Sequence, residues 1–213
     1  QKRDSGETPD YVAGHSLGEY AALFAAGAFD FADGLKIVRK RGELMGQASG
    51  GGMAAVIGMD ADTVRKTLDS TGVDTIDVAN YNAPGQIILS GPVKDLDAVA
   101  DTFEEAGARR WIPLKVSAAF HSRYMEDAGK QFAEFLEGID FSEPTIPVIA
   151  NVTAQPYDAG SIRDNLNRQM TSSVRWQESV EYLLDNVDDP EFEEIGPGKV
   201  LSGMISRIKK AHG

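Results

Sequence analysis

The hydrophobic pattern of the first fifty residues predicts a short buried strand followed by two helices. An apolar run ends at Ala13 and leads, through a serine between two glycines, into an alanine-rich segment that predicts a helix over residues 17–28. A second helix is predicted over residues 31–47, with Asp30 as its N-cap. Helical spacing places the apolar side chains of this second helix on one broad arc, namely Phe31, Leu35, Ile37, Val38, Leu44 and Met45.

Arg41 breaks this pattern, because it falls near the middle of the apolar arc while its charged neighbours lie opposite. An arginine directed at the interior must be paired, since an uncompensated buried charge is very costly. Its partner is either an aspartate elsewhere in the chain or a carboxylate on a bound ligand, which the guanidinium would hold through two hydrogen bonds.

A different pattern begins after the glycines at residues 50–52, which we interpret as the border of an insertion. Strands are predicted over 53–58, 75–79, 86–90 and 109–116, with helices over 62–70 and 93–106. This βαββαβ order is that of a ferredoxin-like lobe, so we divide the chain into a core of residues 1–50 and 116–213 and an inserted subdomain of residues 51–115. We assign Asn80, Tyr81 and Asn82 to a turn, which either has a purely structural role or faces a cleft.

The core resumes with a helix whose apolar stripe includes Met125 and Phe132. The apolar run 146–152 predicts a buried parallel strand. Helices over 161–170 and 174–186, a strand over 192–195 and a last helix from residue 199 complete an α/β fold with a parallel-sheet core.

Composition narrows the possible functions. The 213 residues include no cysteine, which excludes disulfides, thiolate metal sites and cysteine nucleophiles and is compatible with a cytoplasmic location. The net charge of −12 argues against binding to nucleic acid or to anionic membranes, which favour basic surfaces. No apolar run is long enough to span a bilayer, and we expect neither a metal site nor a bound cofactor.

Gly14, Ser16 and Gly18 form the G-x-S-x-G pattern of a nucleophile elbow. The turn from strand to helix is so tight that we expect no room for a side chain at either glycine. Ser16 is then forced outward at the helix tip, where the N–H of Leu17 can donate to an oxyanion. The alternative is that Ser16 merely caps the helix.

His121 is the best candidate for a general base among three histidines. His15 adjoins Ser16 but is expected to point away from it, and His212 lies in the C-terminal tail. A structural histidine at a helix start is the alternative interpretation of His121.

Taken together, these motifs resemble the malonyl-CoA:acyl-carrier-protein transacylase family. The resemblance runs over nearly the whole chain and rests on Gly14-His15-Ser16-Leu17-Gly18-Glu19-Tyr20, Arg41-Gly42, Ala79-Asn80-Tyr81-Asn82-Ala83-Pro84-Gly85-Gln86, Phe120-His121-Ser122 and Glu194-Ile195-Gly196-Pro197-Gly198-Lys199-Val200-Leu201.

The resemblance implies an α/β acyltransferase with a hydrolase-like core, in which Ser16 is the nucleophile and His121 its base. It implies that Arg41 grips the malonyl carboxylate, that Gln169 orients His121 through its backbone or side chain, and that Leu17 and Asn80 belong to the substrate site. By the same resemblance, Phe120 before the histidine implies a preference for malonyl over methylmalonyl groups. The implied reaction takes malonyl-CoA as substrate and loads the phosphopantetheine thiol of an acyl carrier protein for fatty-acid synthesis.

One departure from the family pattern concerns the N-terminal side of the elbow. The family has an upstream strand and a Gly-Gln-Gly loop whose glutamine N–H is the second oxyanion donor, and the sequence given starts after that point. We therefore expect the isolated chain to be weakly active or unstable. Two other functions stay open: a serine acyl hydrolase, which would need a third, acidic residue, and a non-catalytic module or synthase domain that docks the carrier.

The last predicted helix carries the clearest basic patch, formed by Lys199, Arg207, Lys209 and Lys210. Favourable charge at a helix C-terminus is the plain explanation. Because carriers of this family are acidic, we also expect the acyl carrier protein to dock here, on a monomeric enzyme.

Overall fold

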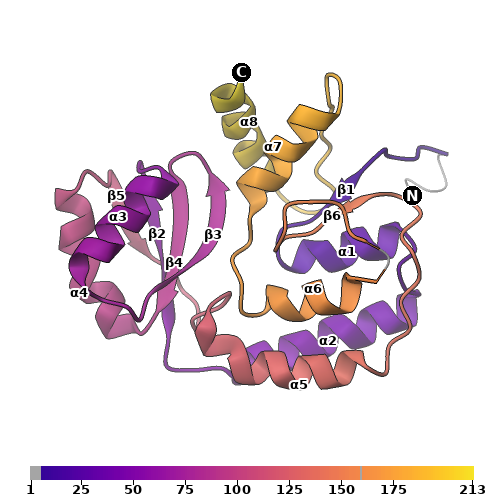
Figure 1. Ribbon diagram of the computed structural model, residues 1–213, viewed down its shortest axis with the longest axis horizontal. Coiled ribbons are helices and arrows are strands. Elements are labelled where there is room, and N and C mark those ends of the chain that lie inside the picture. The colour runs from indigo at the N-terminus through magenta and orange to yellow at the C-terminus, as the bar shows by residue number, and fades with distance from the viewer. Residues whose placement is uncertain (1–5, 159) are drawn as a thin grey trace.

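The computed structural model describes residues 6–158 and 160–213, so the first five residues of the predicted core lie outside the described part. The chain forms a helical core and a separate sheet-containing lobe, which lie side by side in Figure 1. The core contains the two short strands β1 (Val12–Ala13) and β6 (Val148–Ile149) with the helices α1 (Leu17–Ala25), α2 (Phe31–Gln47), η2 (Arg123–Met125), α5 (Glu126–Leu136), α6 (Ile162–Gln169), α7 (Trp176–Asn186) and α8 (Val200–His212).

Helix α2 follows its predicted bounds. The Asp30 side chain accepts a hydrogen bond from the N–H of Asp33 at 2.8 Å, as expected of an N-cap. Arg41 is 5% exposed, as its place on the apolar arc predicts. That arc is wider than the buried face, however, because Phe31 and Leu35 at its first turns are 64% and 55% exposed. Helix α1 ends three residues earlier than predicted, before a turn in which Gly27 has φ 80°.

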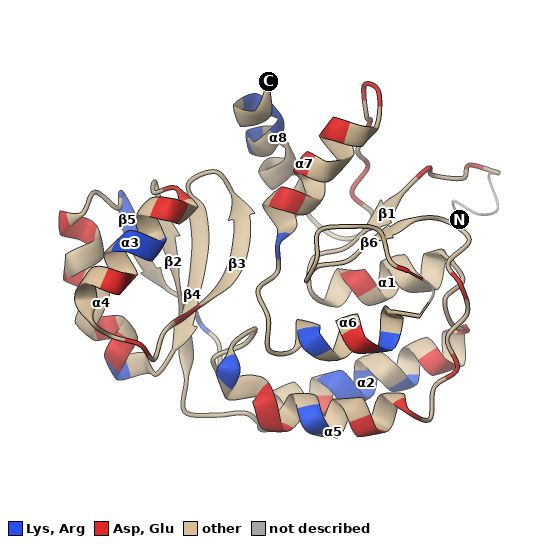
Figure 2. Cartoon of the chain, viewed as in Figure 1, with Lys and Arg blue, Asp and Glu red and all other residues tan. Residues whose placement is uncertain are grey.

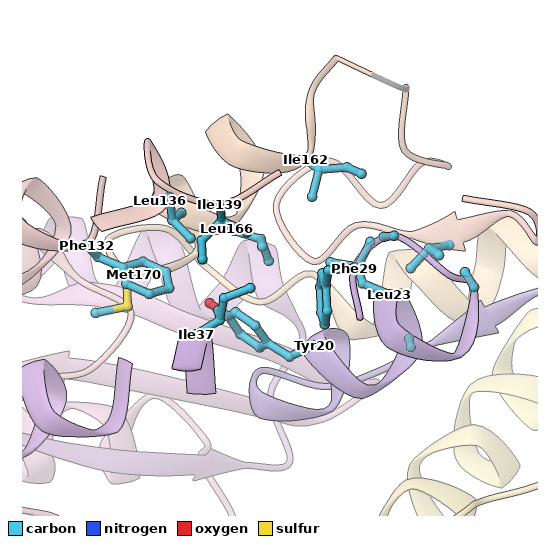
Figure 3. Packing of buried hydrophobic residues seen from close by; sticks show 14 of the residues in the cluster. Tyr20, Leu23, Phe29, Ile37, Phe132, Leu136, Ile139, Ile162, Leu166 and Met170 are labelled. Atoms are coloured by element: carbon cyan, nitrogen blue, oxygen red, sulfur yellow. The ribbon is translucent and has the colours of Figure 1, made fainter. Parts of the chain in front are cut away.

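Helices α1, α2, α5 and α6 enclose the main hydrophobic core. Tyr20 of α1 lies beside Ile37 of α2, Leu23 of α1 lies beside Phe29, and the side chains of α5 and α6 close the cluster from the other side (Figure 3). The members that are fully buried include Phe132, Leu136, Ile162 and Leu166. This packing fixes α1, which follows Ser16, against α2, which carries Arg41.

The lobe has the ferredoxin-like arrangement predicted from its βαββαβ order. Its strands are β2 (Gly52–Ile57), β3 (Asp77–Ala83), β4 (Gln86–Gly91) and β5 (Arg110–Pro113), in the sheet order β3-β4-β2-β5 with every neighbouring pair antiparallel. Helices α3 (Ala61–Thr71) and α4 (Val93–Glu105) pack on one face. The other face packs near Phe120, which precedes the candidate base.

The assignment of residues 80–82 to a turn is wrong. They belong to β3, which continues to Ala83 with two register irregularities, and only the next two residues form the hairpin turn. Through Asn80, β3 also makes a parallel bridge to Val174 of the core. The lobe therefore contacts the core through the part of β3 that lies beyond residue 79, where the predicted strand ended.

Two predicted strands are also corrected. The run 146–152 contributes only β6, which pairs in parallel with β1, because the chain turns back after Ala150, whose N–H bonds the carbonyl of Gln155. Residues 192–195 form no strand. The Glu194 carboxylate instead accepts hydrogen bonds from the N–H groups of Leu201 and Ser202 at the start of α8, so this segment caps a helix.

Candidate active site

Ser16 occupies a strained turn between β1 and α1. Its φ of 49° lies in the left-handed region, and its side chain makes no capping hydrogen bond, which removes the interpretation of Ser16 as a simple N-cap. A Cβ on Gly14 would lie 2.0 Å from the backbone of Gly18, so glycine is required there. The same expectation for Gly18 is wrong, because a Cβ at that position would meet nothing within 4 Å apart from its chain neighbours and the backbone of its own helix. The close approach is that of the Gly14 Cα to the backbone of Gly18. A side chain is therefore excluded at Gly14 but not at Gly18.

His121 lies against the serine. The Nε2 of His121 is 2.8 Å from Ser16 Oγ, and its Nδ1 is 2.8 Å from the carbonyl oxygen of Gln169. Since a carbonyl can only accept, Nδ1 carries the proton and Nε2 presents its lone pair to the serine hydroxyl. Burial lowers the pKa of His121 to about 4, so the imidazole is a neutral base at physiological pH.

Arg41 approaches the same serine from α2. Its Nη2 donates to Ser16 Oγ at 2.8 Å and to the side-chain oxygen of Gln169 at 3.2 Å. Its Nε is buried without a partner, and its guanidinium lies 5.3 Å from the ring centroid of Tyr20. Of the two partners considered from the sequence, a buried aspartate is not found among the described residues. The guanidinium therefore retains donor capacity next to the serine.

Gln169 is the residue that connects these groups. Its carbonyl orients His121, and its side-chain Nε2 donates to the carbonyl of Ser16 at 3.0 Å as well as to Glu19. The contact to His121 is thus made through the backbone, one of the two possibilities that the sequence left open.

Sequence reasoning missed two members of this network. Asn151 accepts from the N–H of Ser16 at 2.8 Å and donates to the carbonyl of Gly14 at 2.6 Å, so it braces both sides of the elbow. Glu19, inside the elbow motif, is 1% exposed and bonds the N–H of Asn151. The available signals were an asparagine at the carboxyl end of an apolar run and an acidic residue on an otherwise apolar helix.

The remaining candidates are placed differently. Leu17 is the first residue of α1, 51% exposed, and its N–H has no intrahelical acceptor, as an oxyanion donor requires. His15 points away from Ser16, as expected, and its Nε2 bonds Asn82 at 2.7 Å. Asn80 is buried in β3, where its strand contacts the core, and the structure records no bond from it to Ser16, His121 or Arg41.

An open cavity of about 710 Å³ reaches the buried histidine from the boundary between lobe and core. It is lined by Asp77, Val78, Tyr81, His121, Arg123 and Ser172, among others. In the described part of the chain no group of three or more His, Cys, Asp or Glu side chains could hold a metal ion. None of the helices that the structure describes is long and apolar enough to cross a membrane.

Comparison with known proteins agrees with this geometry. Residues 3–206 match the acyl transferase domain family. The chain belongs to this family. It is 52% identical to the polyketide biosynthesis malonyl CoA-acyl carrier protein transacylase BaeC of Bacillus velezensis over 97% of this chain and 72% of that protein.

Two solved structures extend the likeness to three dimensions. The malonyl CoA-acyl carrier protein transacylase of Burkholderia pseudomallei superimposes with a TM-score of 0.92 at 43% identity, covering 98% of this chain and 73% of that one. A malonyl-transacylase in complex with a type II polyketide synthase acyl-carrier protein gives a TM-score of 0.93 at 36% identity, over 98% of this chain and 69% of that one. The acyltransferase fold predicted from the sequence is thereby confirmed.

Proposed function

We propose that this acyl transferase domain moves a malonyl group from malonyl-CoA, through an ester on Ser16, to the phosphopantetheine thiol of an acyl carrier protein. The observation that carries the proposal is the convergence of His121 Nε2 and Arg41 Nη2 on one serine oxygen, each at 2.8 Å. A base and a buried cation on the same hydroxyl suit a nucleophile that attacks an acyl group bearing a carboxylate.

In the first half-reaction His121 takes the hydroxyl proton as Ser16 Oγ attacks the thioester carbonyl. The N–H of Leu17 stabilises the resulting oxyanion. The intermediate then collapses, the C–S bond breaks, and protonated His121 returns its proton to the departing CoA thiolate. In the second half-reaction His121 takes the proton of the pantetheine thiol, the sulfur attacks the malonyl ester, and Ser16 leaves with that proton.

Arg41 is the proposed partner of the malonyl carboxylate, through the donor capacity that its contacts to Ser16 and Gln169 leave open. Asn80 is proposed as a further substrate contact, since its strand borders the cavity that reaches His121. Fatty-acid synthesis is the proposed destination of the malonyl group. The 52% identity to BaeC favours polyketide synthesis as the second candidate, with the same chemistry.

A serine acyl hydrolase fits the site less well. Such an enzyme would use an acidic residue to orient the histidine, whereas Nδ1 of His121 bonds a backbone carbonyl. It would also have no use for an arginine at the serine.

We further propose that residues 51–115 act as a wall of the substrate cleft, that the core comprises residues 1–50 and 116–213, and that the protein works as a cytoplasmic monomer.

The experiment that tests the proposed function is mass analysis of the intact chain and of its peptides after brief incubation with malonyl-CoA. We expect an adduct of one malonyl group on Ser16 that is discharged by added carrier protein and is absent from Ser16→Ala. Discharge by water alone, with no acylated carrier, would indicate the hydrolase. A carrier that binds the chain without any adduct forming, even after the upstream strand and Gly-Gln-Gly loop of the family are added, would indicate a docking module.

Carrier docking gives a separate prediction for α8. Lys and Arg residues lie along its C-terminal turns (Figure 2), and Lys209 lies over the ring of Phe192. We expect Lys210→Glu to raise the KM for the carrier severalfold at low salt, with kcat and the KM for malonyl-CoA unchanged. Lys130→Glu on the distant helix α5 is the matched control. An unchanged carrier KM in Lys210→Glu would argue against docking on α8.

A further inference from the structure

Glu19 has no part in the chemistry proposed so far, yet its buried carboxylate accepts three hydrogen bonds from residues of the site. Its Oε1 accepts hydrogen bonds from the N–H of Asn151 at 2.8 Å and from the hydroxyl of Tyr157 at 2.7 Å. Its Oε2 accepts from the side-chain amide of Gln169. A buried carboxylate held by three donors has a fixed position.

These contacts connect Glu19 to both halves of the site. Asn151, held by Glu19, bonds the N–H of Ser16 and the carbonyl of Gly14, and so supports the strained elbow. Gln169, also held by Glu19, orients His121 through its carbonyl and Arg41 through its side-chain oxygen. One carboxylate therefore determines where the nucleophile, the base and the cation meet.

The charges of Glu19 and Arg41 also connect the two residues. Among the residues that the structure describes, Glu19 is the one buried carboxylate and Arg41 the one buried guanidinium. The amide of Gln169 lies between them, with its oxygen toward Arg41 and its nitrogen toward Glu19. A buried cation requires a nearby anion, and among the buried side chains that the structure describes Glu19 supplies it.

We propose that Glu19 is a positioning residue that ties the serine elbow to Arg41 and His121, and that it serves as the counter-charge of Arg41 until a substrate carboxylate takes over this role. The inference rests on the proposed function, because it needs an acyl group that carries a carboxylate. When the malonyl carboxylate pairs with Arg41, two anions face one cation, and Glu19 takes up a proton.

The titratable groups around Glu19 make this proton uptake measurable. Burial raises the pKa of Glu19 to about 7, against the opposing effects of its three hydrogen bonds and, to a smaller extent, of the charge of Arg41. Pairing of Arg41 with a substrate carboxylate offsets the charge of Arg41 and brings a second anion near Glu19, and both changes raise the pKa of Glu19 further. Burial moves the pKa values of its neighbours away from neutrality, downward for His121 and His15 and upward for Tyr20 and Tyr157. Glu19 is thus the group in this network that titrates near pH 7.

The test is calorimetry of ligand binding to the Ser16→Ala chain at pH 7.5, in two buffers that differ in ionisation enthalpy. Malonyl-CoA is compared with acetyl-CoA, because the phosphates of the shared CoA moiety then cancel. We expect malonyl-CoA to bind with an additional uptake of up to about one proton. The excess should vanish in Ser16→Ala/Glu19→Gln and persist in Ser16→Ala/Glu43→Gln, whose substituted residue is exposed on the same helix as Arg41.

A second measurement does not depend on the folding of the Glu19 variant. In the Ser16→Ala chain, the affinity for malonyl-CoA relative to acetyl-CoA should fall as the pH rises above 7, by up to about tenfold per unit. A malonyl preference that is constant from pH 6 to 8.5, or an excess proton uptake that survives Glu19→Gln, would overturn the role of Glu19. If a malonyl adduct still forms on Ser16, that failure leaves the proposed function intact.

Discussion

Replacing His121 with alanine is expected to slow acylation of Ser16 by about 10²–10⁴-fold, the range that general acid–base catalysis contributes. His121 Nε2 is the proposed acceptor of the hydroxyl proton, and no other base is recorded on Ser16 Oγ in the described part of the chain. The measurement is the single-turnover rate of adduct formation from malonyl-CoA. The matched control is His212→Ala, which should leave the rate unchanged. His212 lies at the C-terminal end of α8 and pairs with Asp185 of α7.

The pH dependence of this rate tests the same assignment. Only neutral imidazole can accept the serine proton, and burial lowers the pKa of His121 to about 4. The histidine therefore remains a competent base as the pH falls, and its contribution is lost only as the pH approaches 4. An inflection near 6.5 that vanishes in His121→Ala would contradict the buried, neutral base that the geometry implies.

The chemistry of the site was easier to predict than the interactions that support it. Each of the three main residues has a signal that can be seen in the sequence. Ser16 lies in a motif, His121 is the best placed of three histidines, and Arg41 is a charged residue on an apolar helix face. The structure brings all three together. Asn151 and Glu19 act through partners more than a hundred residues away, and neither periodicity nor spacing encodes such distant pairings.

The fold was predictable where local pattern decides it. The βαββαβ lobe was found because alternation, helical spacing and turn residues agree along a continuous stretch. The boundaries failed where tertiary contacts prevail. Strand β3 runs through the supposed turn at residues 80–82 because it pairs with β4 and with Val174, and residues 192–195 cap α8 instead of forming a strand.

Arg41 carries the second large prediction, which concerns substrate choice. Arg41→Ala should lower kcat/KM for malonyl-CoA by about 2–5 kcal/mol in transition-state free energy, because a substrate carboxylate would be left buried and unpaired. This corresponds to a loss of about 30-fold to several thousand-fold. Acetyl-CoA carries no carboxylate, so its kcat/KM should fall much less, and the ratio of the two kcat/KM values should shift toward acetyl.

The ratio is the decisive quantity, since Arg41 also bonds Ser16 Oγ and its removal changes the nucleophile for every substrate. Arg41→Lys separates charge from shape. Lysine restores a cation but not the planar fork that can hold Gln169, Ser16 and a carboxylate together, so we expect only part of the malonyl preference to return. Equal losses for malonyl-CoA and acetyl-CoA in Arg41→Ala would show that the arginine supports the serine alone. The malonyl carboxylate would then have to be recognised by another group lining the cavity that reaches His121.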